Sequence, residues 1–96
     1  MKPLTIGKLR GLQQISSSRG TFTALALDHR QNLRKANPAF INDEELSRFK
    51  LDVTSALAAK ATAVLLDPEV SAAQAIAQRA IPNSVGLVVA VDVLNA

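Results

Sequence analysis

The stretch ALALDHR, residues 24–30, runs from four apolar residues into an acid, an imidazole and a guanidinium. The same pattern returns as AVLLDPE, residues 63–69, and as VVAVDVL, residues 88–94. Each run is apolar at successive positions, so both faces of a strand built from it would be apolar. Such strands are typical of a buried parallel sheet. Three apolar runs that each lead into an aspartate therefore indicate three parallel strands.

A strong helical pattern lies between the first two apolar runs. It predicts a helix over 43–59, because apolar residues recur there at steps of three and four and Asn42 can cap the first turn. Arg48, Lys50 and Asp52 fall elsewhere on the helical wheel. We therefore expect these three side chains to lie away from the apolar side of the helix.

Two shorter helical patterns complete the order of elements. One predicts a helix over 5–15, followed by a turn that contains Gly20. The other predicts a helix over 71–80, with Ser71 and Gln74 as its capping pair and Pro82 as the residue that stops it. Strands that alternate with helices imply βαβ units and right-handed crossovers.

The chain is thus predicted to be an α/β protein of about three β/α units with parallel strands. We expect one partial domain, 1–96, with a helix and turn over 1–20, β/α units over 21–61 and 62–84, and a third strand unit over 85–96. The strands themselves are expected at 21–27, 62–66 and 85–91. Three parallel strands leave both outer edges unpaired. We therefore expect the N-terminal part of a larger α/β protein, truncated at residue 96, which forms homo-oligomers through its open sheet edges.

Composition excludes several classes of function. The 96 residues include no cysteine, one histidine and three phenylalanines as the only aromatic residues, so disulfides, thiolate sites and stacking platforms for single-stranded nucleic acid are excluded. The net charge of +3 is mild. The basic residues of the polar segment after the first strand suit one phosphate rather than a nucleic acid, or alternatively only solvate a helix start: Arg30, Arg34 and Lys35. We expect no metal, no cofactor, no membrane segment and a cytoplasmic location.

The aspartates after the three runs are the candidate site residues. Since the carboxyl ends of parallel strands meet at one edge, Asp28, Asp67 and Asp92 should lie together there, where α/β proteins build their sites. Asp28 is the candidate catalytic residue, because His29 and Arg30 follow it directly. His29 suits either acid–base catalysis or a hydrogen bond at this edge. Asp67 and Asp92 suit substrate binding, or alternatively a turn or a helix cap.

Two longer segments resemble a known family. GKLRGLQQISSSRGTFTALALDHRQNLRK, residues 7–35, and FKLDVTSALAAKATAVLLDPE, residues 49–69, resemble the N-terminal third of class I aldolases of the tagatose-1,6-bisphosphate aldolase and sulfofructose-phosphate aldolase type. The matching positions are Gly7, Lys8, Gly11, Asp28, Arg30, Phe49, Lys50 and residues 66–69. The resemblance implies a (β/α)8 TIM barrel, of which this chain would form the first part.

The resemblance also implies a reaction. These enzymes cleave a phosphorylated ketose such as tagatose 1,6-bisphosphate, through a lysine Schiff base, into dihydroxyacetone phosphate and an aldehyde. Asp28 would lie beside the Schiff base, and His29, Arg30, Asp67 and Asp92 would contact the substrate. His29 replaces the glutamine of the tagatose type and is closer to a deoxy-ketogluconate-phosphate aldolase-like branch, so the sugar stays open.

The lysine of the Schiff base lies on a later strand in this family. None of the lysines here, at positions 2, 8, 35, 50 and 60, ends a predicted strand. The 96 residues alone are therefore expected to be inactive. Two other readings stay open: a non-catalytic scaffold or assembly piece with the same shape, and another phosphosugar lyase or isomerase on the same barrel.

Overall fold

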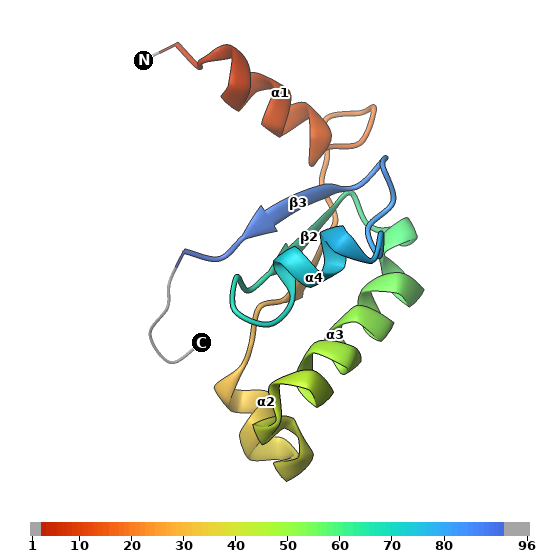
Figure 1. The fold of residues 1–96 in the computed structure, drawn as a ribbon. Coiled ribbons are helices and arrows are strands. Elements are labelled where there is room, and N and C mark those ends of the chain that lie inside the picture. Colours follow the sequence, from red (N-terminus) through yellow and green to blue (C-terminus); the bar gives the residue numbers. More distant parts are fainter. Residues whose placement is uncertain (1–2, 92–96) are drawn as a thin grey trace.

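A computed structural model describes residues 3–91 of the chain (Figure 1). The elements in order are α1 (Ile6–Gln14), β1 (Ala24–Leu27), α2 (Gln31–Ala36), the 3-10 helix η1 (Pro38–Ile41), α3 (Asp43–Leu57), the 3-10 helix η2 (Ala58–Lys60), β2 (Ala63–Leu66), α4 (Ala72–Ala77) and β3 (Gly86–Val89). The predicted alternation of strands and helices is confirmed, and the fold is α/β.

The three strands form one open sheet in the order β1-β2-β3, and both neighbouring pairs are parallel. The register aligns Ala24 with Ala63 and Gly86 at the start, and Leu27 with Leu66 and Val89 at the end. This arrangement confirms the parallel sheet and is consistent with part of a barrel. The closure of a barrel and the division into β/α units stay predictions. Asp92 lies outside the described residues, so its expected place beside Asp28 and Asp67 also stays a prediction.

The core lies between the sheet and the two helices α3 and α4. Side chains alternate across a strand, so Val64 and Leu66 of β2 point to the same face, where both are fully buried. Leu51 of α3 and Ala75 of α4 pack in the same apolar cluster. The buried members of this cluster are all leucine, valine or alanine, so the core contains no large aromatic side chain.

The expectation that every strand is buried on both faces is wrong for the two outer strands, β1 and β3. In β3, which pairs with β2 alone, Val88 and Val89 are exposed. The same holds for β1. Ala24 and Ala26 are exposed, whereas Leu25 and Leu27 are half-buried against the core. The physical reason is its position: β1 pairs with β2 on one side only, and α3 and α4 cover only one face of the sheet. The central strand β2 has the predicted burial, with three of its four residues buried.

The segment after β1 is helical rather than a polar loop. Residues 31–36 form α2, which includes Lys35, and η1 follows it directly. The side chain of Arg34 explains the compact turn, because it donates to the carbonyl oxygen of Phe40 at 3.1 Å and pairs with Asp43 at 2.5 Å. The rings of Phe40 and Phe49 lie 5.0 Å apart and pack η1 against α3.

The ends of the helices agree only in part with the sequence pattern. Asn42 caps α3 as predicted, accepting from the backbone N–H groups of Glu44 and Glu45. The predicted cap by Ser71 is wrong, since its hydroxyl makes no cap hydrogen bond to α4. That helix also ends at Ala77, well before Pro82, and Arg79 turns the chain with a φ of 55°.

Gly86 allows the end of α1 to approach β3 closely. A Cβ atom at Gly86 would lie 2.6 Å from Cγ2 of Ile15 and 2.9 Å from the backbone oxygen of Gln14. Both distances are shorter than van der Waals contact, so one chain would have to shift. The contact between the first helix and the last strand therefore requires a residue without a side chain.

We predict that Gly86→Ala lowers the free energy of unfolding by about 1–3 kcal/mol, the usual cost of overpacking. The matched control is Gly11→Ala in α1, where an added Cβ meets no atom within 4 Å. That change should stabilise the chain by about 0.5–1 kcal/mol, because alanine is the better helix former. Urea unfolding of the three proteins measures both changes, and equal effects of the two substitutions would contradict the close approach at Gly86.

Candidate functional site

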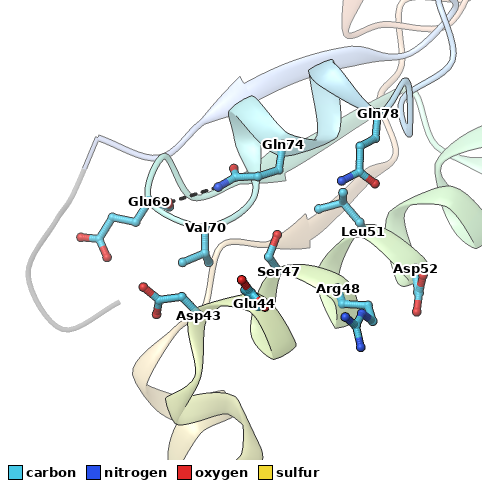
Figure 2. Close-up of a pocket in the computed structure, with 10 residues that line it drawn as sticks. All are labelled: Asp43, Glu44, Ser47, Arg48, Leu51, Asp52, Glu69, Val70, Gln74 and Gln78. Carbon is cyan, nitrogen blue, oxygen red and sulfur yellow. Dashed lines mark hydrogen bonds between the residues drawn. The ribbon is translucent and has the colours of Figure 1, made fainter.

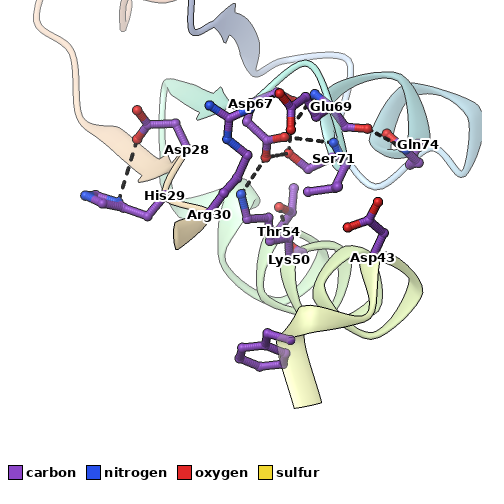
Figure 3. A network of polar contacts seen from close by, with 12 residues as sticks. Asp28, His29, Arg30, Asp43, Lys50, Thr54, Asp67, Glu69, Ser71 and Gln74 are labelled. Carbon is purple, nitrogen blue, oxygen red and sulfur yellow. Dashed lines mark hydrogen bonds and ion pairs between the residues drawn. The ribbon is translucent and has the colours of Figure 1, made fainter. Parts of the chain in front are cut away.

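The candidate site lies at the edge of the sheet where the strands end. β1 ends at Leu27 and β2 ends at Leu66, so Asp28 and Asp67 each follow a strand directly. Because the two strands are parallel and in register, the segments 28–30 and 67–71 lie at the same edge. We call these two segments the rim. Figure 3 shows the polar side chains that meet there.

Asp28 and His29 form the accessible part of the rim. The Asp28 side chain is 26% exposed and the His29 side chain 58% exposed, and Oδ1 of Asp28 lies 3.8 Å from Nδ1 of His29. This distance is too long for a direct hydrogen bond. A carboxylate and an imidazole thus lie side by side and are both accessible to solvent, which suits hydrogen bonding to hydroxyl groups or proton transfer.

Arg30 connects the two segments of the rim. Its side chain is 4% exposed, and Nη1 lies 2.6 Å from Oε1 of Glu69. Arg30 belongs to the end of β1, whereas Glu69 belongs to the loop after β2. The ion pair therefore links the two strand ends and holds the residue next to Asp28 and His29.

Lys50 is the residue at the rim that the sequence analysis placed wrongly. We expected it to face away from the apolar side of its helix, but its side chain is fully buried and its Nζ pairs with Oδ1 of Asp67. Leu46, Lys50 and Thr54 are spaced by four, and all three are buried on the side of α3 that faces the sheet. That spacing was the signal that could have found Lys50.

Asp67 has a protein partner for each carboxylate oxygen. Oδ1 accepts from Lys50 and from the Ser71 hydroxyl at 2.6 Å, and Oδ2 accepts from the backbone N–H groups of Glu69 at 3.0 Å and Val70 at 2.8 Å. Its side chain is 1% exposed. Asp67 therefore has the geometry of a turn residue, which was the alternative to substrate binding. Direct contact with a substrate would require the ion pair between Lys50 and Asp67 to open.

The environment of this pair shifts the pKa of both groups. Burial alone would raise the pKa of Asp67, but the hydrogen bonds from Lys50, Ser71 and Val70 outweigh burial and hold it below the ordinary value. Burial lowers the pKa of Lys50, although the hydrogen bond and the charge of Asp67 offset part of that decrease. Asp67 is therefore an anion at neutral pH.

The basic cluster predicted from the sequence is divided in the structure. Arg30 pairs with Glu69 at the rim, whereas Arg34 pairs with Asp43 at the start of α3. Lys35 is exposed on α2. The three cations thus have separate surroundings, and Arg30 is the one that the rim buries.

An open groove borders the rim on the side of the helices. It has a volume of about 450 Å³ and lies between the first half of α3 and the start of α4, with Glu69, Val70 and Gln74 on its wall (Figure 2). The Gln74 side-chain oxygen is buried and accepts no hydrogen bond from residues 3–91. The Gln74 amide nitrogen donates to the backbone oxygen of Glu69 at 3.5 Å. The groove gives the Glu69 side chain open space on one side.

Within residues 3–91, histidine and acidic side chains nowhere gather in a group of three that could hold a metal ion. In the same part of the chain, every helix is too short or too polar to cross a lipid bilayer.

Comparison with known proteins relates this stretch to sugar-phosphate aldolases. The chain is 38% identical over 72 residues to tagatose 1,6-diphosphate aldolase 2 of Enterococcus faecalis, a match that covers 72% of this chain and 22% of the relative. The tagatose 1,6-diphosphate aldolases of Listeria monocytogenes and Listeria innocua are also 38% identical over 72 residues, with 21% of each relative covered. The chain spans about a fifth of the length of these curated relatives. No protein-family model matches it.

We predict that Lys50→Met lowers the free energy of unfolding by about 3–5 kcal/mol, because it leaves the Asp67 carboxylate buried without its cation. The double variant Lys50→Met with Asp67→Asn should recover most of that loss, since an amide oxygen can still accept from the loop. Chemical unfolding followed by circular dichroism measures both. A double variant as unstable as the single one would contradict a loss that comes from the unpaired charge.

We predict that acid removes the contribution of Asp67 to stability. The folded-state pKa of Asp67 lies below 3.8, the ordinary pKa of an aspartate, so the unfolded chain takes up the proton first as the pH falls. The contribution is complete above pH 3.8 and is lost as the pH falls through the folded-state pKa. Unfolding measured from pH 7 to pH 2 should show a smaller acid loss in the double variant. An identical acid profile would exclude this role.

Proposed function

We propose that this chain forms part of the active-site rim of a class I aldolase that cleaves a phosphorylated ketose. The observation that carries the proposal is the juxtaposition of Asp28, His29 and Arg30 with the loop after β2, linked through the Arg30–Glu69 pair. The similarity to tagatose 1,6-diphosphate aldolases supports it. Tagatose 1,6-bisphosphate is the proposed substrate, and dihydroxyacetone phosphate and an aldehyde are the products.

Each rim residue has a proposed role in that reaction. In retro-aldol cleavage an amine condenses with the ketone, and the resulting iminium accepts the electron pair of the breaking carbon–carbon bond. A carboxylate must remove the proton from the hydroxyl whose carbon becomes the aldehyde. Asp28 is the proposed base, because its carboxylate is partly exposed, whereas that of Asp67 is buried and that of Glu69 is paired with Arg30. His29 is proposed to hydrogen-bond a sugar hydroxyl, and Arg30 to bind a phosphate.

Asp67 and Asp92 complete the proposed substrate contacts on different grounds. Asp67 is buried with its partners, so we propose that it acts by fixing the loop that carries Glu69. Asp92 lies outside the described residues, and its proposed role depends only on its position after the third apolar run.

We further propose that the amine of the Schiff base is none of the lysines of this chain. Lys50 is fully buried in its pair with Asp67. Lys8, Lys35 and Lys60 are exposed on helices rather than at strand ends. Lys2 lies outside the described residues.

Titration of the ¹⁵N-labelled chain with tagatose 1,6-bisphosphate tests the binding role of the rim. We expect amide shifts concentrated at residues 28–30 and 67–71. Asp28→Asn should weaken binding at least about tenfold, since a hydrogen bond to a charged group contributes about 1.5–3 kcal/mol. Asp52→Asn, an exposed acid on α3, is the matched control and should bind as the unaltered chain does. Shifts elsewhere, or equal effects of the two substitutions, would exclude the proposed rim.

Borohydride trapping with dihydroxyacetone phosphate tests the source of the amine in the same sample. Mass spectrometry should find no covalent adduct on the chain, because no described lysine combines exposure with a place at a strand end. An adduct on any of the five lysines would refute this part of the proposal and leave the binding result unaffected.

A further inference from the structure

We propose that Glu69 occupies an oxyanion site formed by Arg30, and that a phosphate group displaces it when a ligand binds. The inference deepens the proposed function and rests on it for the identity of the ligand as a sugar phosphate. The site itself follows from the contacts of two side chains, Arg30 and Glu69 (Figure 3).

The Arg30 guanidinium has more binding capacity than its partner uses. It presents five N–H donors in a planar fork that suits two oxygens at once. Within residues 3–91 its only ion pair is the contact of Nη1 with Oε1 of Glu69. At 4% exposure the guanidinium is shielded from water, and an oxyanion that replaced Glu69 would therefore meet a weakly screened cation.

Lys50 adds a second buried cation to the same cluster. Its Nζ stays paired with Asp67, and both of these side chains are almost completely buried. A ligand arriving from solvent could therefore reach neither side chain of the Lys50–Asp67 pair. The Arg30–Glu69 pair is the one contact of the described rim network that joins a buried cation to an exposed anion.

Glu69 can leave Arg30 without a change in the loop. Its side chain is 55% exposed, and its carboxylate makes no other hydrogen bond or ion pair among the described residues. The backbone of Glu69 is held independently, because its N–H donates to Asp67 at 3.0 Å and its carbonyl oxygen accepts from Gln74 at 3.5 Å. Rotation of the side chain is therefore sufficient to free the guanidinium.

The surroundings of Glu69 provide room for that rotation. Glu69 lines the open groove of about 450 Å³ beside α3 (Figure 2). The pair is open to water on the Glu69 side, so part of its attraction is screened. A phosphate that engages two N–H groups of the same guanidinium can therefore replace it. Glu69 thus occupies the Arg30 site in the absence of ligand and lowers the apparent affinity of that site for phosphate.

Phosphate titration of the full 96-residue chain tests the inference. Inorganic phosphate is added at constant ionic strength, and backbone amide shifts at residues 30 and 69–71 report binding. Glu69→Gln should bind phosphate up to about fivefold more tightly than the unaltered chain, because the competing charge is gone. Glu44→Gln is the matched control: it removes an exposed acid that makes no ion pair among the described residues, and its affinity should not change. Equal affinities of all three proteins, or weaker binding by Glu69→Gln, would overturn the inference.

Variants of Arg30 check that the guanidinium is the ligand. Arg30→Gln should abolish the phosphate-dependent shifts, and Arg30→Lys, which keeps the charge without the planar fork, should weaken them. If Arg30→Gln does not fold, the result for Arg30→Lys decides, and unchanged binding by that variant would refute the site.

A parallel titration with dihydroxyacetone phosphate distinguishes the sources of the phosphate group. Tighter binding than inorganic phosphate, lost in Asp28→Asn, would support a sugar phosphate as the ligand. Equal binding of both probes would support a free phosphate at the same site and count against the proposed function alone.

Discussion

The buried ion pair between Lys50 and Asp67 is the interaction on which the arrangement of the rim depends. It joins the middle of α3 to the end of the central strand, and neither side chain is exposed to water by more than 1%. Removal of two charges from water is costly, and the attraction between them offsets that cost only when their remaining hydrogen bonds are also satisfied. Asp67 meets this condition through Ser71 and two backbone N–H groups. The pair therefore contributes less to net stability than to a unique orientation of α3 and the loop after β2.

The rim combines two kinds of charge pair with different consequences. The Lys50–Asp67 pair is closed to solvent and fixes backbone positions, whereas the Arg30–Glu69 pair is open on the side of its acid. Asp28 and His29 stand next to the open pair with their polar atoms accessible. A backbone held by one ion pair, next to side chains that can move, suits a site that binds a charged, hydroxyl-rich molecule and releases it again.

The sequence predicted the sheet more reliably than the side chains at its edge. Apolar runs fix parallel strands because burial of successive residues leaves few alternatives, and β2 follows that rule. The rule failed at β1 and β3, because the burial of a strand depends on its neighbours as well as on its own residues. Lys50 was misplaced for a related reason: a charge is assigned to the surface unless a partner is known, and that partner, Asp67, lies 17 positions away in the sequence. The Ser71 hydroxyl was likewise assigned to a helix cap, although the nearby carboxylate of Asp67 is the acceptor it reaches.

The close approach of Ile15 to Gly86 has a consequence for the order of events during synthesis. The end of α1 leaves the ribosome early, whereas the glycine that receives it comes from β3, the last strand described. During translation α1 cannot reach its contact at Gly86 until β3 has been made, so the apolar side chains of α1 stay uncovered while the segment between them is synthesised. Because Ile6, Leu9 and Leu12 stay exposed even afterwards, α1 presents apolar surface throughout this interval, and exposed apolar surface makes a growing polypeptide prone to aggregation.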